Sequence, residues 1–204
     1  MEGLDIISAI AHLRSDKILS HYLDSITLEK RNPSKDVYTG LLKSIVSQQL
    51  SVKAAETIYG RFLDLFEDRI PDADKIPQLT DDALRGAGLS GQKTGYIRNV
   101  VDFFSTRELF DVKWDTYSDD AIIKQLSEIK GVGKWTVEMI LMFVLKRPDV
   151  FPVLDLGIQK GMKRVYGLTT DKKELHKEMV AIAEQWRPYR TVACLFLWEV
   201  GNGV

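Results

Sequence analysis

One carboxylate in an apolar stretch is the residue of this chain best placed for chemistry. Asp155 stands between Leu154 and Leu156, directly before a helical pattern over residues 156–166. Burial of an acid costs free energy unless the acid is paired or has a function, so the position predicts an N-cap, a catalytic group, or both at once. We expect the two flanking leucines to hold Asp155 rigid and partly dry.

A second stretch, about twenty residues upstream, can bind an anion. Around Gly131-Val132-Gly133 a helical pattern stops and restarts at once. Such a turn directs backbone N–H groups and a helix N-terminus outward, where a DNA phosphate fits. From Lys124 to Arg164 the chain has eight basic and four acidic residues, although its overall net charge is −1. Solvated helix faces would give the same charge pattern, but its coincidence with the turn favours a DNA contact.

Composition excludes several classes of protein. With 204 residues and 45% hydrophobic content, the chain can bury a core as one domain or two small lobes. The longest apolar run, residues 139–145, is too short to cross a bilayer, and the polar N-terminal residues do not resemble a signal peptide, so we expect an intracellular protein. The single cysteine, Cys194, excludes a cysteine-ligated iron–sulfur cluster and is expected in the core. His12, His21 and His176 are not spaced as metal ligands with carboxylates.

The elements that must position these residues are predicted to be helices. Apolar residues recur with helical spacing nearly throughout, and no strand pattern is convincing, so we predict an all-α fold. Breaks at Asn32-Pro33 and between Pro148 and Pro152 divide the chain into a lobe of residues 38–148 and a second lobe of residues 1–37 and 149–204, with a cleft between the lobes. The predicted caps are Ser51 before helix 52–66, Thr80 with Asp81 and Asp82 before a helix at 83, Ser118 with Asp119 and Asp120 before 121–127, and Thr170 with Asp171 before 172–186.

Taken together, these motifs resemble a known family. They are the Gly131-Val132-Gly133 turn, Trp135, Asp155, the loop Ser47-Gln48-Gln49-Leu50-Ser51, Trp186-Arg187-Pro188-Tyr189-Arg190 and Trp198. These motifs resemble the helix-hairpin-helix (HhH-GPD) DNA glycosylases, in the compact 3-methyladenine DNA glycosylase II branch. The resemblance runs from about residue 38 to the C-terminus. It implies a monomeric base excision repair enzyme that removes 3-methyladenine and 7-methylguanine from double-stranded DNA. Such an enzyme would act in the cytoplasm and nucleoid of a prokaryote or in the nucleus of a eukaryote, and not at a membrane.

The same resemblance assigns roles in the reaction. Asp155 would stabilise the oxocarbenium-like sugar that forms as the glycosidic bond breaks, and would orient the attacking water. Trp135 occupies the position at which relatives that also cut the DNA backbone have a lysine, so the enzyme would be monofunctional, without lyase activity. Trp135 and Trp198 would present aromatic faces to the flipped base. Glu138 either lines this pocket or faces solvent beside Lys134.

The remaining expectations concern the grip on DNA. The loop of Gln48, Gln49 and Leu50 would enter the minor groove, with either Gln49 or Leu50 filling the gap left by the flipped nucleotide. The hairpin would bind phosphate through Lys130, Gly131, Val132, Gly133, Lys134 and Thr136. Backbone carbonyls of Ile129 and Val132 would hold Na⁺ or K⁺, and no cofactor is required. Two alternatives stay open: a non-catalytic hairpin protein that recognises damaged or branched DNA, and a glycosylase for hypoxanthine, uracil or a mismatched pyrimidine.

Overall fold

The protein is helical, as the apolar spacing predicts. A computed structural model describes residues 4–24, 26 and 36–203, and these residues contain helices and no strand. The all-α prediction is therefore confirmed. The break predicted at Asn32-Pro33 lies outside the described residues. Within the described ranges, no helix is long and apolar enough to cross a membrane.

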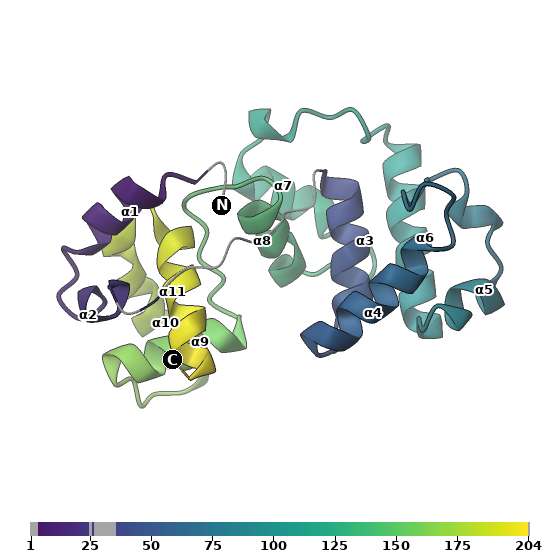
Figure 1. The fold of residues 1–204 in the computed structure, drawn as a ribbon. Coiled ribbons are helices and arrows are strands. Elements are labelled where there is room, and N and C mark those ends of the chain that lie inside the picture. The colour runs from purple at the N-terminus through teal and green to yellow at the C-terminus, as the bar shows by residue number, and fades with distance from the viewer. Residues whose placement is uncertain (1–3, 25, 27–35, 204) are drawn as a thin grey trace. The chain divides into compact units, whose positions relative to one another are not determined.

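The chain divides into two compact units, which are described separately. The first, here the Asp155 unit, consists of the described residues before position 34 and those from Leu141 onward. Its helices are α1 (Ile6–Leu13), α2 (Ser20–Leu23), α9 (Leu156–Tyr166), α10 (Lys172–Ala183), the 3-10 turn η3 (Glu184–Trp186) and α11 (Arg190–Asn202). Helix α11 packs along α9 and also contacts α1 and α2 (Figure 1).

Glycine permits the close approach of α9 and α11. A Cβ at Gly161 would lie 2.2 Å from the carbonyl oxygen of Leu197. Real side-chain atoms do not approach a backbone oxygen so closely, so any larger residue would push the helices apart. Because Asp155 directly precedes α9, this contact sets where the N-terminus of α9 lies against α11.

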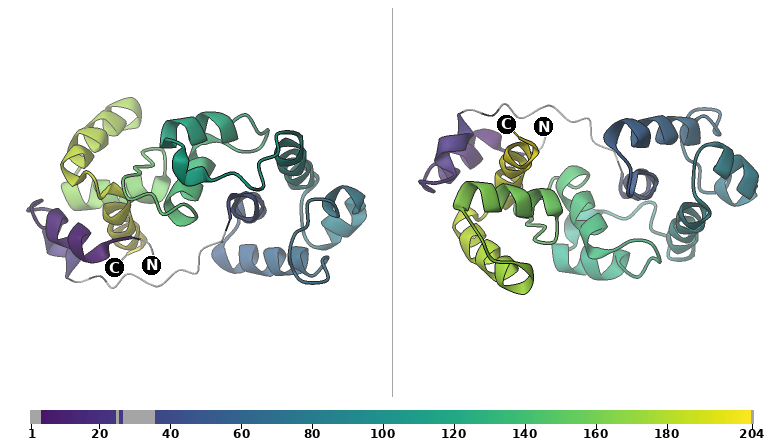
Figure 2. Two further views of the ribbon diagram at one scale, coloured as in Figure 1. Left: turned by 90° about the horizontal axis from the view of Figure 1, so that it is seen from above. Right: turned by 90° about the horizontal axis from the view of Figure 1, so that it is seen from below.

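The second unit, here the hairpin unit, ends at Ile140, within α8. The sequence suggested a division near residue 148 instead. Helix α3 packs against α4 and α6, and α5 packs against α6 (Figure 2). The elements of this unit are α3 (Val37–Ser47), α4 (Val52–Leu63), η1 (Ile76–Gln78), α5 (Asp81–Gly86), α6 (Gly91–Thr106), η2 (Trp114–Thr116), α7 (Asp119–Leu126) and the first part of α8 (Lys134–Phe143).

Three of the four predicted N-caps are confirmed. The side chains of Ser51, Thr80 and Ser118 each accept a hydrogen bond from the backbone N–H three residues later. Of the pair predicted to cap α10, Asp171 is the N-cap residue, although its side chain makes no capping hydrogen bond. Thr170 is not a cap, because its hydroxyl donates to Glu178 Oε2 at 2.8 Å instead. Two helix ends also differ: α4 ends at Leu63 rather than at residue 66, and α10 gives way to a 3-10 turn from residue 184.

A buried carboxylate in the N-terminal segment of the Asp155 unit binds side chains of the segment from Leu141 onward. Asp16, which is 4% exposed, accepts hydrogen bonds at Oδ2 from the Tyr166 hydroxyl (2.5 Å) and from Trp186 Nε1 (2.8 Å). Its Oδ1 accepts from the backbone N–H groups of Ile18 and Leu19. Burial raises the pKa of Asp16, but these hydrogen bonds outweigh burial and hold the pKa below its usual value.

Asp16→Asn is expected to lower the free energy of unfolding by about 1–3 kcal/mol at pH 7, because the amide cannot accept from all four donors. A lowered pKa stabilises the fold above the pKa of the unfolded chain, about 3.9, and this contribution is lost as the pH falls through the folded pKa. The difference between wild type and variant should therefore shrink at pH 3. Urea denaturation at both pH values measures it, and a gap independent of pH would contradict the role of the charge.

Candidate active site

Asp155 is buried at the N-terminus of α9. Its Oδ1 accepts hydrogen bonds from the backbone N–H of Ile158 at 2.9 Å and from Trp198 Nε1 at 2.8 Å. The residue is 8% exposed. The sequence-based prediction of an N-cap is therefore confirmed. The indole donor adds a second hydrogen bond that fixes the direction of the carboxylate.

The leucines beside Asp155 do not shield it. Asp155 is partly dry, as expected, but Leu154 is 51% exposed and Leu156 is 78% exposed, so its burial does not come from these leucines. Asp155 has extended backbone angles, and in extended chain successive side chains point to opposite sides. When the acid turns inward to cap α9, its neighbours turn outward. The rigidity of Asp155 comes from its hydrogen bonds.

Trp198 reaches Asp155 because residue 157 is glycine. A Cβ at Gly157 would lie 2.6 Å from Trp198 Cδ1. The indole also stacks on Phe143, with ring centroids 5.6 Å apart and an interplanar angle of 28°. Sequence reasoning named Trp198 only as a wall of the base pocket, and missed that its N–H binds the carboxylate.

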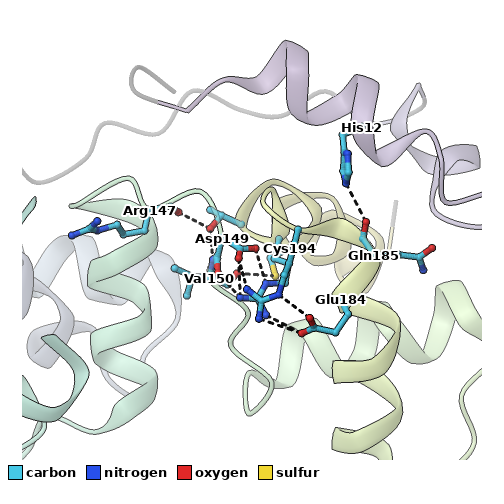
Figure 3. Close-up of polar contacts among 10 residues, drawn as sticks. His12, Arg147, Asp149, Val150, Glu184, Gln185 and Cys194 are labelled. Carbon is cyan, nitrogen blue, oxygen red and sulfur yellow. Dashed lines mark hydrogen bonds and ion pairs between the residues drawn. The ribbon is translucent and has the colours of Figure 1, made fainter. Parts of the chain in front are cut away.

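The N-terminus of α11 holds the loop that leads to Asp155. The Thr191 hydroxyl donates to the carbonyl of Arg147 at 2.6 Å and accepts from the N–H of Val150 at 3.0 Å. Figure 3 labels Arg147, Asp149 and Val150 of this loop. The Arg190 guanidinium binds the Asp149 carboxylate at 2.7 Å. Cys194 is buried with Sγ 3.9 Å from the carbonyl of Val150, so its expected place in the core is confirmed.

Arg190 was among the motifs of the family resemblance but was given no role, and Thr191 was not singled out from the sequence. Thr191 and Arg190 lie more than 40 positions from the loop residues that they bind. The only signal for this contact was the polar start of an otherwise apolar helix pattern. Further along the loop, Gln159 Nε2 donates to the carbonyl of Val153 at 3.0 Å, which anchors the backbone two residues before Asp155.

In the hairpin unit, the turn between α7 and α8 uses its two glycines differently. Gly131 has φ +104°, and a Cβ there would lie 2.2 Å from Tyr96 Cγ, so the fold itself requires glycine. Gly133 is exposed, and a Cβ there would meet nothing within 4 Å. The turn is closed by a hydrogen bond of 2.9 Å from the N–H of Val132 to the carbonyl of Ile129.

Residues in and just before the first half of α8 differ in their exposure to solvent, and therefore in whether they could contact DNA. Lys134 is exposed, and Trp135 is 40% exposed. Glu138 is 4% exposed and its Oε1 lies 3.7 Å from Lys134 Nζ, so the alternative in which it faces solvent is wrong. Val132 and Thr136 are also buried, and their contact with phosphate stays a prediction.

The loop between α3 and α4 is tied to the hairpin. Gln48 Nε2 donates to the carbonyl of Gly131 at 3.1 Å. Gln49 is exposed and has φ +58°, whereas Leu50 is half-buried. Across the described residues, no group of three or more His, Cys, Asp or Glu side chains could hold a metal ion. The cation expected at the carbonyls of Ile129 and Val132 stays a prediction.

Comparisons with known proteins agree with this arrangement. The model of the HhH-GPD superfamily base excision DNA repair proteins matches residues 42–188. DNA-3-methyladenine glycosylase 1 of Schizosaccharomyces pombe is 30% identical, covering 91% of this chain and 80% of the relative. A putative DNA-3-methyladenine glycosylase of Bacillus subtilis is 33% identical over 80% of this chain and 58% of its own length.

Solved structures show the same similarity. A DNA-3-methyladenine glycosidase from Bacillus halodurans has a TM-score of 0.80 and 34% identity, covering 98% of this chain and 90% of that one. The 3-methyladenine DNA glycosylase of S. pombe, solved in complex with abasic DNA, has a TM-score of 0.83 and 28% identity, covering 96% and 97%. The hairpin, the acid that caps α9 and the similarity to these relatives lead to one conclusion. The chain belongs to the HhH-GPD superfamily of base excision DNA repair proteins and is a base-excision glycosylase.

Proposed function

We propose that this glycosylase hydrolyses the bond between deoxyribose and an alkylated purine, 3-methyladenine or 7-methylguanine, in double-stranded DNA and leaves the strand intact. The observation that carries the proposal is the buried carboxylate of Asp155, fixed by Ile158 and Trp198. The names of the relatives support the choice of lesion. We further propose that the protein acts as a monomer on the DNA of the nucleoid or nucleus.

In the proposed reaction, Asp155 stabilises charge that exists only in the transition state. The glycosidic bond breaks, the base leaves with the bonding electrons, and the sugar becomes an oxocarbenium-like cation. A carboxylate that is already fixed in a partly dry site interacts with this cation without a cost of reorganisation. Asp155 would also orient the water that attacks the sugar and completes the hydrolysis.

The preference for alkylated purines follows from their charge. A purine alkylated at N3 or N7 is cationic, so it is a good leaving group and needs little help from a general acid. The ring of Trp198 would favour such a base by about 0.5–2 kcal/mol over a neutral one, which is at most about thirtyfold in selectivity. The weakened bond supplies the rest. Trp135 belongs to the hairpin unit, and its contact with the base stays a prediction.

Chromatography of bases released from methylated duplex DNA tests the proposal. We expect 3-methyladenine and 7-methylguanine in the soluble fraction, and none above background with Asp155→Asn. Duplexes that contain uracil or hypoxanthine should release much less base. Faster release of uracil or hypoxanthine would assign the enzyme to another lesion, and no release from any duplex would favour a protein that only recognises damage.

The product strand is expected to stay intact until alkali or heat is applied. Trp135 cannot act as the amine nucleophile that a lyase requires, and Lys134 is rotated from it by about 100° on the helix. Borohydride should therefore trap no covalent complex of protein and DNA. Denaturing gel electrophoresis measures both results, and a trapped complex would show that Lys134 or another amine attacks the sugar.

A further inference from the structure

Two segments of the hairpin unit that the proposed function places on DNA are joined directly. The carbonyl of Gly131, in the hairpin, accepts the hydrogen bond of 3.1 Å from Gln48 Nε2, in the loop between α3 and α4. The two residues are 83 positions apart in sequence. Both are only partly exposed. The amide of Gln48 is thus directed at protein backbone.

Side chains of helix α6 donate hydrogen bonds to the backbone of α3, just before the loop, and to the hairpin. Lys93 Nζ donates to the carbonyl of Val46, near the end of α3, at 2.8 Å. Further along α6, Asn99 Nδ2 donates to the carbonyl of Lys130 at 3.0 Å. Between these positions the Tyr96 ring lies against Gly131, so closely that no Cβ would fit there.

These contacts fix backbone that would otherwise be free to rotate. The adjacent carbonyls of Lys130 and Gly131 are each held by an amide side chain, so the peptide planes of the turn have defined directions. A lysine ammonium near a helix C-terminus satisfies a carbonyl that lacks a partner within the helix. Partial burial beside the loop that it anchors lowers the pKa of Lys93.

We propose that Gln48 is a positioning residue, not a DNA contact, and that together with Lys93 and Asn99 it makes the loop and the hairpin one preorganised DNA-binding element. This inference rests on the proposed function. A rigid element has less conformational entropy to lose when it binds, so more of the contact energy is available for flipping the base. The exposed Gln49 is then the residue of this loop that enters the duplex.

Amide hydrogen exchange in the DNA-free protein tests the brace, by which we mean the hydrogen bonds of Gln48, Lys93 and Asn99 to the loop and the hairpin. Gln48→Met keeps the side-chain length and removes the N–H donor. Loss of one hydrogen bond should accelerate exchange of the Val132 amide about two- to tenfold, with the midpoint of thermal unfolding within a few degrees of wild type. Gln48→Glu, which directs an oxygen at the Gly131 carbonyl, should do the same and replaces the methionine variant if that one does not fold.

Gln49→Met is the matched control, because it makes the same chemical change one residue further along the loop. It should leave exchange at Val132 unchanged and lower excision. Gln48→Met should lower single-turnover excision as well, and its effect should be less than additive with that of Asn99→Leu, since both residues hold the same turn.

The outcomes separate the brace from the activity. Unchanged exchange together with reduced excision in Gln48→Met would mean that Gln48 acts on DNA directly, which overturns the proposal. Faster exchange with wild-type excision would also overturn it, since the enzyme would not need the brace. If the wild-type protein released no base from methylated DNA, the proposed function would fail, while the exchange measurement would still report on the brace.

Discussion

Asp155→Asn should bind DNA as wild type does and excise alkylated purines at least about two orders of magnitude more slowly under single-turnover conditions. Both described hydrogen bonds to the side chain end on Oδ1, and asparagine retains an oxygen that can accept from Ile158 and Trp198. The variant therefore keeps the cap of α9 and loses the negative charge. Excess enzyme on a methylated duplex gives the rate, and fluorescence anisotropy gives the affinity.

Two further variants decide how this result is interpreted. Glu138→Gln alters a buried acid of α8, and should leave excision within a few-fold of wild type. Trp198→Phe keeps an aromatic ring and removes the donor to Asp155, so it should give an intermediate loss. If Asp155→Asn excised almost normally, Asp155 would be only an N-cap. A large loss in Glu138→Gln alone would transfer the catalytic role to Glu138.

Features of the fold that depend on neighbours in sequence could be predicted well. Helical periodicity and capping are local, so Ser51, Thr80 and Ser118 were identified from a few residues each. The same locality explains the error at Thr170, where two adjacent residues could both cap and Glu178 takes the threonine hydroxyl. Asp155 was recognisable because its cap is local.

Features that depend on distant residues could not be predicted. The hydrogen bond from Trp198 to Asp155 spans 43 positions and requires glycine at 157, and nothing in the local pattern indicates it. The exposure of Leu156 was misjudged for a related reason, since hydrophobicity alone does not say which side of an extended segment faces the core. The contacts of α6 with the loop and the hairpin are likewise visible only in three dimensions.

Gly133→Asp is expected to fold normally and to lose DNA binding by two or more orders of magnitude. In the free protein a Cβ at position 133 meets nothing within 4 Å and the backbone is not left-handed, so the fold does not need glycine there. The proposed phosphate site does need it, because a carboxylate beside the N-terminus of α8 would repel the phosphate, and like charges brought together cost several kcal/mol. Titration of a labelled duplex at fixed salt measures the change.

Two glycine variants make this result specific. Gly86→Asp introduces the same charge at another exposed glycine of the hairpin unit with open space around it, and should bind DNA as wild type does. Gly131→Ala should instead lower the unfolding temperature, because its left-handed backbone and the Tyr96 ring exclude a side chain. Normal affinity in Gly133→Asp would show that DNA docks elsewhere on the protein. If Gly133→Asp and Gly86→Asp lost DNA affinity equally, the loss would come from the added net charge alone. Only a local phosphate site would distinguish the two positions.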